Sequence, residues 1–248
     1  AFRAVAQKVS YNVAIVPSLL VPELIRKTIG INSLVASKEV WYIAMAPIAA
    51  LIFFISSLAE TGRAPFDLLE AESEIVAGYQ TEYSGLKFGM FYVGEFLHAF
   101  TISALTATLF LGGWRGPGSE TYPILGTFYF FIKTFMMYFV VAWIRISLPR
   151  LRIDQMLNFN WKFLTPIALV LLIATALVEK ILGLYLPELN LVEAAIPWVR
   201  AAAHLVINIL IIWGTIGLLK RVQGKTRKVV GSPRPLAVAP EPPASVIS

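Results

Sequence analysis

Long apolar runs alternate with short polar connections along most of the chain. A helix that crosses a bilayer needs about 20 mainly apolar residues. Segments that meet this requirement lie at about 9–29, 40–59, 88–112, 123–148, 162–184 and 198–219. The first is the weakest, because Pro17, Pro22 and Glu23 interrupt it. Since neither an internal repeat nor the alternation of a β-barrel is visible, the pattern predicts an all-α polytopic membrane protein with about six transmembrane helices.

The composition supports a membrane location. Of the 248 residues, 57% are hydrophobic and 15% are charged, whereas about 25% of the residues of a soluble domain are charged. The net charge of +6 would suggest nucleic acid in a soluble protein, but here the basic residues gather at segment ends, where they set membrane topology. The chain has no cysteine, which excludes disulfides, thiolate metal sites and Cys-ligated iron–sulfur clusters within it. Any electron carrier must therefore belong to another chain or be a diffusible molecule.

Basic residues in the connections predict the orientation of the helices. Arg150 and Arg152 lie in the 149–161 connection, and the stretch after the last segment is rich in Lys and Arg. By the positive-inside rule, both face the cytoplasm or its organellar equivalent. By parity, the 60–87 connection and both ends of the chain lie on that side as well. The 30–39 connection and its flank are also basic and disagree with this orientation, which the other connections favour.

The two ends of the chain differ from the rest. Residues 1–221 form the predicted transmembrane domain, whereas residues 222–248 are basic and then rich in proline, with too little apolar surface to fold alone. We expect a disordered cytoplasmic tail, with a partner-binding tail as the alternative.

The chain starts at Ala1 instead of Met, without a visible signal peptide. We expect an N-terminal truncation, with N-terminal processing as the alternative.

The 60–87 connection is unusually acidic. It holds six of the fifteen Asp and Glu residues between positions 60 and 82, interleaved with apolar residues. If the segment is helical, Glu70 and Glu74 share a face and Glu72 points away. Two carboxylates about 6 Å apart repel by about 3 kcal/mol at an effective dielectric near 20, so they ionise and exchange protons as a coupled set. This favours a proton relay. An acidic loop that docks on a basic partner is the alternative, and the two are compatible.

Charged residues within the apolar segments are further candidates. Glu95 follows Lys87 by about 12 Å of helix rise, and a charge at that depth costs about 2.5–3.5 kcal/mol on insertion scales. Lys133 lies near the middle of its segment and is a candidate partner for Glu95. We expect both to line a polar path, with a purely structural ion pair as the alternative.

Four other ionisable residues receive structural interpretations. We expect Glu179 and Lys180, near the end of their segment, to extend towards the interface. His98 and His204 are interpreted as hydrogen-bonding packing residues and not as haem ligands. The sequence predicts no metal site.

Residues 59–88 carry a resemblance to a known family. The chain reads Ala-Glu-Thr-Gly-Arg-Ala-Pro-Phe-Asp over 59–67 and Gly-Tyr-Gln-Thr-Glu-Tyr-Ser-Gly over 78–85. These motifs resemble the signature of the H subunit of bacterial complex I and of subunit 1 of mitochondrial NADH dehydrogenase. Shorter similarities are found at Phe110–Trp114, Lys133–Thr134, Trp143–Arg145, Leu148–Arg150, Asp154–Gln155 and Trp161–Phe163. The resemblance runs from Ala6 to about residue 220.

The resemblance implies a membrane subunit of a proton-translocating NADH:quinone oxidoreductase in a bacterial inner membrane. The family forms much of the quinone chamber and couples quinone reduction to proton movement. It implies quinone as the substrate and no catalytic residue in this chain alone. NADH, FMN and iron–sulfur clusters are expected in partner subunits of the hydrophilic arm, beside neighbouring membrane subunits and lipid. The first two or three helices of the family are expected to be missing.

The resemblance also implies roles for individual residues. The residues that match the chamber wall are Glu60, Arg63, Ala64, Pro65, Phe66 and Asp67. Those expected in the proton path are Glu70, Glu72, Glu74 and Glu95, and we add Lys133 from its position in the membrane. The chain departs from the family at Asn12, Gly62 and Leu69, where Glu, Asn and Pro are usual. The first change puts a proton path through that point in doubt, and the other two are expected to loosen the loop.

Two other classes of protein compete with this interpretation. A membrane subunit of an energy-converting [NiFe] hydrogenase would keep the Arg-x-Pro-Phe-Asp core but generally lacks the motif at 78–85. A stand-alone ion transporter would show broken helices in repeated halves, and a structural membrane scaffold would keep the fold without quinone.

Overall fold

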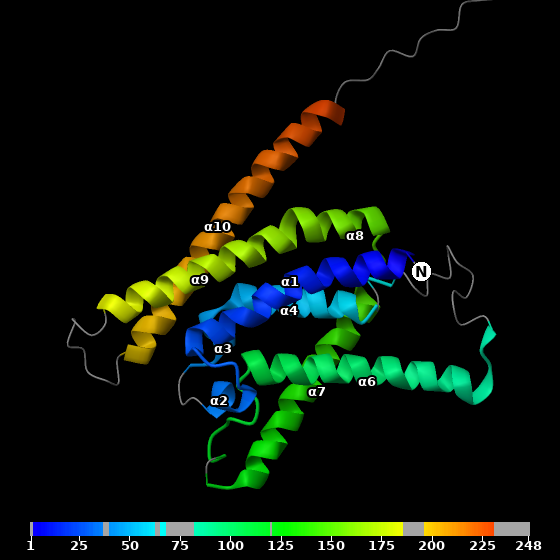
Figure 1. Cartoon of the computed structure of the whole chain (residues 1–248). Coiled ribbons are helices and arrows are strands. Elements are labelled where there is room, and N and C mark those ends of the chain that lie inside the picture. Colours follow the sequence, from blue (N-terminus) through cyan, green and yellow to red (C-terminus); the bar gives the residue numbers. More distant parts are fainter. Residues whose placement is uncertain are drawn as a thin grey trace, which may run out of the picture. The chain divides into compact units, whose positions relative to one another are not determined.

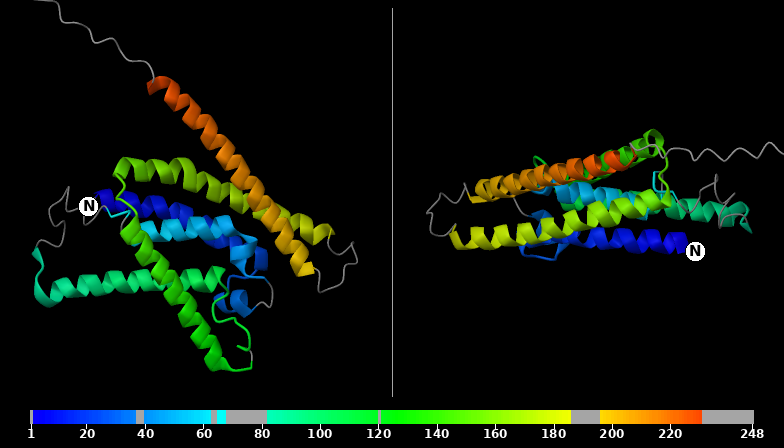
Figure 2. Two further views of the ribbon diagram at one scale, coloured as in Figure 1. Left: turned by 180° about the vertical axis from the view of Figure 1, so that it is seen from behind. Right: turned by 90° about the horizontal axis from the view of Figure 1, so that it is seen from above.

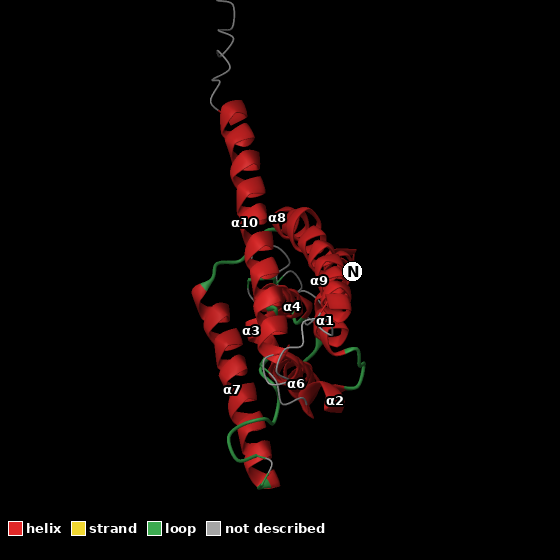
Figure 3. Ribbon diagram, turned by 90° about the vertical axis from the view of Figure 1, so that its left-hand side faces the viewer, coloured by secondary structure: helices red, strands yellow, loops and turns green. Residues whose placement is uncertain are grey.

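The computed structural model describes residues 2–36, 40–62, 65–67, 82–119, 121–185 and 196–230. The helices are α1 (Phe2–Arg26), α2 (Ile31–Ala36), α3 (Tyr42–Met45), α4 (Pro47–Glu60), α6 (Gly85–Phe110), α7 (Pro123–Ser147), α8 (Ile153–Phe159), the π-helix η2 (Asn160–Leu164), α9 (Thr165–Tyr185) and α10 (Ile196–Val230). Figure 3 shows that the described residues form helices and loops, without a strand. Five helical stretches are long and apolar enough to cross a membrane. The prediction of an all-α polytopic membrane protein is therefore confirmed.

α1 runs without a break through Pro17 and Pro22, which were expected to weaken it. It packs against both α4 and α9 (Figure 1). One face of α1 is almost completely buried, at a spacing of three and four residues: Gln7, Tyr11, Ala14, Ser18, Val21 and Ile25. Such a spacing places side chains on one stripe of a helix. Packing along this stripe supports the helix where each proline removes a backbone donor.

The predicted span 40–59 is not one helix, and the expectation of a continuous span there was wrong. The chain breaks at Ala46, with φ −134° and ψ 66°, between α3 and α4. The break has a local cause, because Pro47 disfavours helical backbone at the residue before it. α4 has 14 residues, or about 21 Å of rise, and is shorter than a full crossing.

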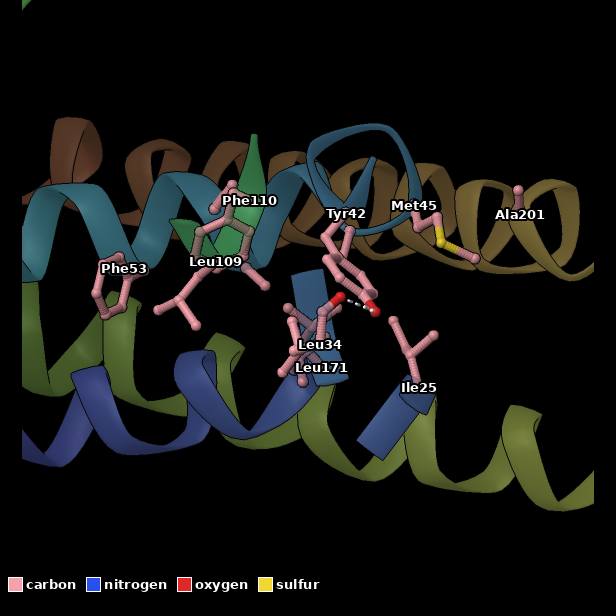
Figure 4. Packing of buried hydrophobic residues seen from close by; sticks show 13 residues of the cluster. Ile25, Leu34, Tyr42, Met45, Phe53, Leu109, Phe110, Leu171 and Ala201 are labelled. Atoms are coloured by element: carbon pink, nitrogen blue, oxygen red, sulfur yellow. Dashed lines mark hydrogen bonds between the residues drawn. The ribbon is translucent and has the colours of Figure 1, made fainter. Parts of the chain in front are cut away.

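A hydrophobic core joins α1, α2, α3, α4, α6, α9 and the first turns of α10. Figure 4 shows Phe53 beside Phe110, whose ring centroids lie 5.5 Å apart. It also shows the Tyr42 hydroxyl, which donates a hydrogen bond of 3.5 Å to the carbonyl of Leu34. A second cluster of buried apolar residues gathers around Phe66, with Tyr11 and Met156 among its members.

α7 crosses α6 (Figure 2), and much of its apolar surface is uncovered. Phe128, Phe139 and Trp143 are each more than 60% exposed. Such surface is suited to lipid or to another membrane subunit.

The end of the chain is described in part. α10 continues to Val230, and the disordered tail expected from residue 222 stays a prediction. Residues 231–248 lie outside the described part of the chain. The chain divides into two compact units, 1–211 and 212–248, and the sites below lie in the first.

Candidate functional site

The predicted chamber segment begins where α4 ends. Glu60 is the last residue of α4 and is half-buried. The Thr61 hydroxyl donates a hydrogen bond of 2.6 Å to the carbonyl of Leu58. Gly62 has a φ of 66°, in the left-handed region that glycine adopts without strain and that asparagine tolerates better than most residues. Glycine in place of asparagine therefore fits this turn, and the expectation that it loosens the loop stays a prediction.

Hydrogen bonds from two distant parts of the chain, α1 and the loop before α8, hold the segment Pro65–Asp67. The buried Gln7 amide on α1 donates to the carbonyl of Ala59 at 2.6 Å and to that of Phe66 at 2.8 Å. The N–H of Leu151 donates to the carbonyl of Pro65 at 3.0 Å. Gln7 was not among the predicted site residues. A polar side chain in the buried stripe of a membrane helix was the signal that could have identified it.

Aromatic packing fixes the side chain of Phe66, which is 5% exposed. Its ring centroid lies 5.6 Å from that of Tyr11. The Tyr11 hydroxyl in turn donates to the carbonyl of Met156 on α8 at 3.3 Å. α1 thus joins the segment to α8.

A π-helix links α8 to α9 and was missed by the predicted span, which started at residue 162. Within it, the Asn160 amide donates to the carbonyl of Ser10 at 2.6 Å, and the Trp161 indole donates to the Ser10 hydroxyl at 3.1 Å. π-helical turns occur often at functional sites. Here the turn locks α8 and its neighbouring loop onto α1.

An apolar cavity of about 650 Å³ lies beside this segment. Its lining residues come from α4, the segment 65–66, the end of α7, the following loop and α8: Leu51, Phe54, Ile55, Leu58, Pro65, Phe66, Ile144, Leu148, Pro149, Leu151, Gln155 and Phe159. Gln155 carries the polar side chain among them. The volume falls within the range of small-molecule sites. Its wall can hold a hydrocarbon chain and offers one amide to a polar group.

The other predicted site residues are placed only in part. Asp67 is half-buried next to Phe66. Arg63, Ala64, Glu70, Glu72 and Glu74 lie outside the described residues, as does Leu69. Their predicted roles stay predictions.

The side chain of Lys133 caps the C-terminal end of α6. Its ammonium donates to the carbonyls of Leu111 at 2.8 Å, Gly113 at 3.1 Å and Arg115 at 2.6 Å. It also lies 4.8 Å from the ring centroid of Trp41. Glu95 is half-buried on α6, about 24 Å of helix rise before Leu111. The expected pairing of Lys133 with Glu95 was therefore wrong, while a role for each in a proton path stays a prediction.

Glu179 and Lys180 were both expected to extend towards the interface, but their exposure differs. Lys180 is exposed, but Glu179 is 5% exposed and its Oε1 lies 3.0 Å from Nε2 of His204. The extension of Glu179 to the interface was wrong, because neighbouring residues on a helix point in different directions. Glu179 continues the buried stripe of α9 that includes Leu171 and Thr175.

His204 is fully buried on α10, so its interpretation as a hydrogen-bonding packing residue agrees with its contact to Glu179. His98 is half-buried on α6. Among the described residues, no group of three His, Cys, Asp or Glu side chains is placed to hold a metal ion.

These features define the class of the protein, a polytopic helical membrane protein with an apolar cavity beside a hydrogen-bonded loop segment. The family model described as NADH dehydrogenase matches residues 1–176. The chain therefore belongs to the NADH dehydrogenase family, and the resemblance drawn from residues 59–88 is confirmed.

Similar curated proteins are bacterial and are named as the H subunit of NADH-quinone oxidoreductase. The protein of Dehalococcoides mccartyi is 39% identical over 221 residues, which cover 89% of this chain and 57% of the relative. The protein of Geobacillus sp. is 44% identical over 182 residues, 73% of this chain and 54% of the relative. That of Protochlamydia amoebophila is 45% identical over 175 residues, 70% of this chain and 52% of the relative. The chain spans about half the length of the curated relatives it matches.

Proposed function

We propose that the chain is the membrane subunit of a proton-translocating NADH:quinone oxidoreductase that forms the quinone-access chamber and couples quinone reduction to proton movement. The observation that carries this proposal is the apolar cavity beside Pro65–Asp67. Membership of the NADH dehydrogenase family and the names of the relatives support it.

The cavity suits the chemistry of a membrane quinone. A quinone has an apolar tail and a compact headgroup that accepts hydrogen bonds at its carbonyls. The tail would lie along the wall formed by α4 and α8, and the headgroup would pass the polar residues near Gln155 and Asp67. Glu60, Arg63 and Ala64 complete the proposed chamber wall along the sequence.

The quinone headgroup would be reduced at its contact with the partner subunits. The chain has no cysteine and in this proposal supplies no redox centre. NADH, FMN and the iron–sulfur clusters would belong to the partner subunits. The role of this chain would be to hold and orient the quinone and to exclude water around its tail.

Coupling would use the acidic residues that follow the chamber segment. A quinone that gains two electrons carries negative charge until it takes up two protons, and this charge changes the electric field around it. Glu70, Glu72 and Glu74 would respond as a coupled set, because closely spaced carboxylates do not ionise independently. Protons would then shift towards Glu95 on α6, and Lys133 on α7 would lie at the C-terminal end of α6.

The proposed setting is a bacterial inner membrane, with both ends of the chain on the cytoplasmic side. The 60–87 connection would face the same side and meet the hydrophilic arm that bears the terminal iron–sulfur cluster. Neighbouring membrane subunits and lipid would cover the exposed apolar surface of α7.

A cavity-filling substitution in the complete complex tests the chamber. Ile55 lines the cavity and is half-buried. Ile55→Trp should therefore obstruct the tail and raise the KM for quinone by about tenfold, since 1.4 kcal/mol of lost binding corresponds to a factor of 10. Ile173→Trp is the matched control, because Ile173 is 60% exposed on α9 and does not line this cavity.

Oxidation of NADH by a hydrophilic artificial acceptor reports electron input that does not need the chamber. It should stay unchanged in both variants. If an assembled Ile55→Trp complex reduced quinone with the KM of the Ile173→Trp control, the cavity would not be part of the chamber. Co-purification of a [NiFe] subunit with the chain would instead favour the hydrogenase alternative.

A further inference from the structure

A buried polar cluster joins α9, α10 and α3 in the first compact unit. Glu179 Oε1 and His204 Nε2 lie 3.0 Å apart, with both side chains at least 94% buried. One turn later on α10, the amide of the fully buried Asn208 donates to the carbonyl of His204 at 2.8 Å and to that of Met45 at 3.1 Å. Met45 and the nearby Ala201 belong to the hydrophobic core (Figure 4). The cluster is therefore enclosed by apolar packing.

We infer that Glu179 and His204 form an internal proton-exchange site inside the membrane domain, held in place by Asn208. This inference goes beyond the proposed function, because the residues of the proposed chamber and acidic path take no part in it. Its ligand is a proton that is delivered and removed by water.

The contact geometry allows one proton to be gained and lost. In the deprotonated form, neutral His204 donates from Nε2 to the Glu179 carboxylate, and the pair carries one negative charge. A proton from water then gives a carboxylic acid at Glu179 beside a neutral imidazole. This form has no net charge, which favours it in an apolar interior. Loss of that proton back to water restores the first form.

Polar atoms without a partner supply the exit points for this proton. Glu179 Oε2, His204 Nδ1 and Asn208 Oδ1 are buried and have no hydrogen-bond partner among the described residues. A buried polar atom without a partner costs about 1–3 kcal/mol, and ordered water usually satisfies such groups. The second carboxylate oxygen and the second ring nitrogen are thus free to exchange a proton with water.

Stability alone does not account for the pair. A buried ion pair is often no more stable than well-packed apolar residues of similar volume, and ionisable residues within membrane helices generally mark proton or ion pathways. The charged residues closest along the chain are Arg200, which lies one turn before His204 and is half-buried, and Lys180, which follows Glu179 and is exposed. Glu23 and Arg26 lie near the end of α1.

Infrared spectroscopy of the complete complex tests this site without using turnover. A pH step should produce a difference band from the carboxylic acid C=O stretch of Glu179. The band should shift when H₂O is replaced by D₂O, because the proton exchanges with water. Glu179→Gln, which keeps the shape of the side chain but cannot ionise, should lose the band completely. Lys180→Gln, at the exposed neighbouring position, should keep it.

A spectrum of Glu179→Gln that matches the wild type in the carboxyl region would overturn the inference. So would a band without a D₂O shift, since the proton would then be fixed. If Glu179→Gln does not assemble, His204→Gln decides: a displaced carboxyl band supports the pair, and an unchanged one contradicts it. Because these measurements do not depend on quinone reduction, the inference and the proposed function can fail separately.

Discussion

Lys133 and the Glu179–His204 pair are ionisable groups inside transmembrane helices, but their hydrogen bonding differs. Lys133 directs its ammonium at three backbone carbonyls, which matches the three donors of that group. The Glu179–His204 pair shares one contact and leaves Oε2 and Nδ1 without a partner among the described residues. We call a charge saturated when all its hydrogen-bond donors have partners, and the pair unsaturated because two of its polar atoms have none. A saturated charge stabilises the fold, whereas an unsaturated pair keeps the capacity to exchange a proton.

The setting of Lys133 explains why it is saturated. The last carbonyls of a helix lack intrahelical donors and carry the negative end of the helix dipole. The chain after α6 turns sharply at Gly112 and Gly113, with φ of 72° and 50°. These turns direct several carbonyls at one point, where Lys133 from α7 donates to them.

The largest expected effect follows from removal of the saturated charge. Lys133→Met keeps the length of the side chain but leaves three carbonyls of the α6 end without their donor. We expect a loss of about 3 kcal/mol in the free energy of unfolding, because a hydrogen bond to a charged group contributes about 1.5–3 kcal/mol and three bonds that share one ammonium are not additive. Unfolding in mixed micelles measures this loss. Lys133→Arg, which keeps the charge, should recover part of it, and a stable Lys133→Met protein would show that the carbonyls find other donors.

The hydrogen bonding of Gln7 is intermediate between that of Lys133 and that of the Glu179–His204 pair. Its substitution should have the second largest effect on stability. Its amide nitrogen donates twice, whereas its Oε1 has no partner among the described residues. Gln7→Leu should cost about 2 kcal/mol, since two hydrogen bonds of about 1 kcal/mol each are lost. The same variant releases Phe66, so in the complete complex the KM for quinone should rise as well. An unchanged KM with a lowered unfolding free energy would separate the segment from the chamber.

Sequence alone was sufficient for most of the fold. Apolar runs long enough to cross a bilayer located α6 and α7 to within a few residues, because lipid forces backbone groups into helices. Local signals for two errors were present in the sequence. Pro47 indicated the break before α4, and the spacing of Leu171, Thr175 and Glu179 indicated a buried face.

The candidate site was less predictable, because its geometry depends on contacts between distant segments. Gln7 meets Phe66, Leu151 meets Pro65, and Glu179 meets His204 only after the helices pack. No period or spacing within one segment encodes such pairs. The family motif identified Pro65–Asp67 but gave no indication of the cavity beside it or of the π-helix at Asn160–Leu164.

The turn that serves Lys133 provides a smaller test. A Cβ atom at Gly113 would lie 3.1 Å from Val35, and its φ of 50° is unfavourable for a side chain. Gly113→Ala should therefore cost about 1–2 kcal/mol. Gly94→Ala is the matched control, because Gly94 lies within α6 with open space around its Cβ position and should gain about 0.5–1 kcal/mol. Equal changes in the two unfolding free energies would exclude a special role for this turn.

The smallest expected effect lies at the unsaturated pair. Glu179→Gln keeps a group that can accept a hydrogen bond from His204, and it leaves a neutral imidazole instead of an isolated charge. We expect the free energy of unfolding to change by less than about 1 kcal/mol, the value of one neutral hydrogen bond. Measured beside Lys133→Met in the same micelles, this change should be the smaller by at least a factor of two. A loss at Glu179 as large as that at Lys133 would mean that the pair stabilises the junction of α9 and α10, and the distinction between saturated and unsaturated charges would not describe this membrane domain.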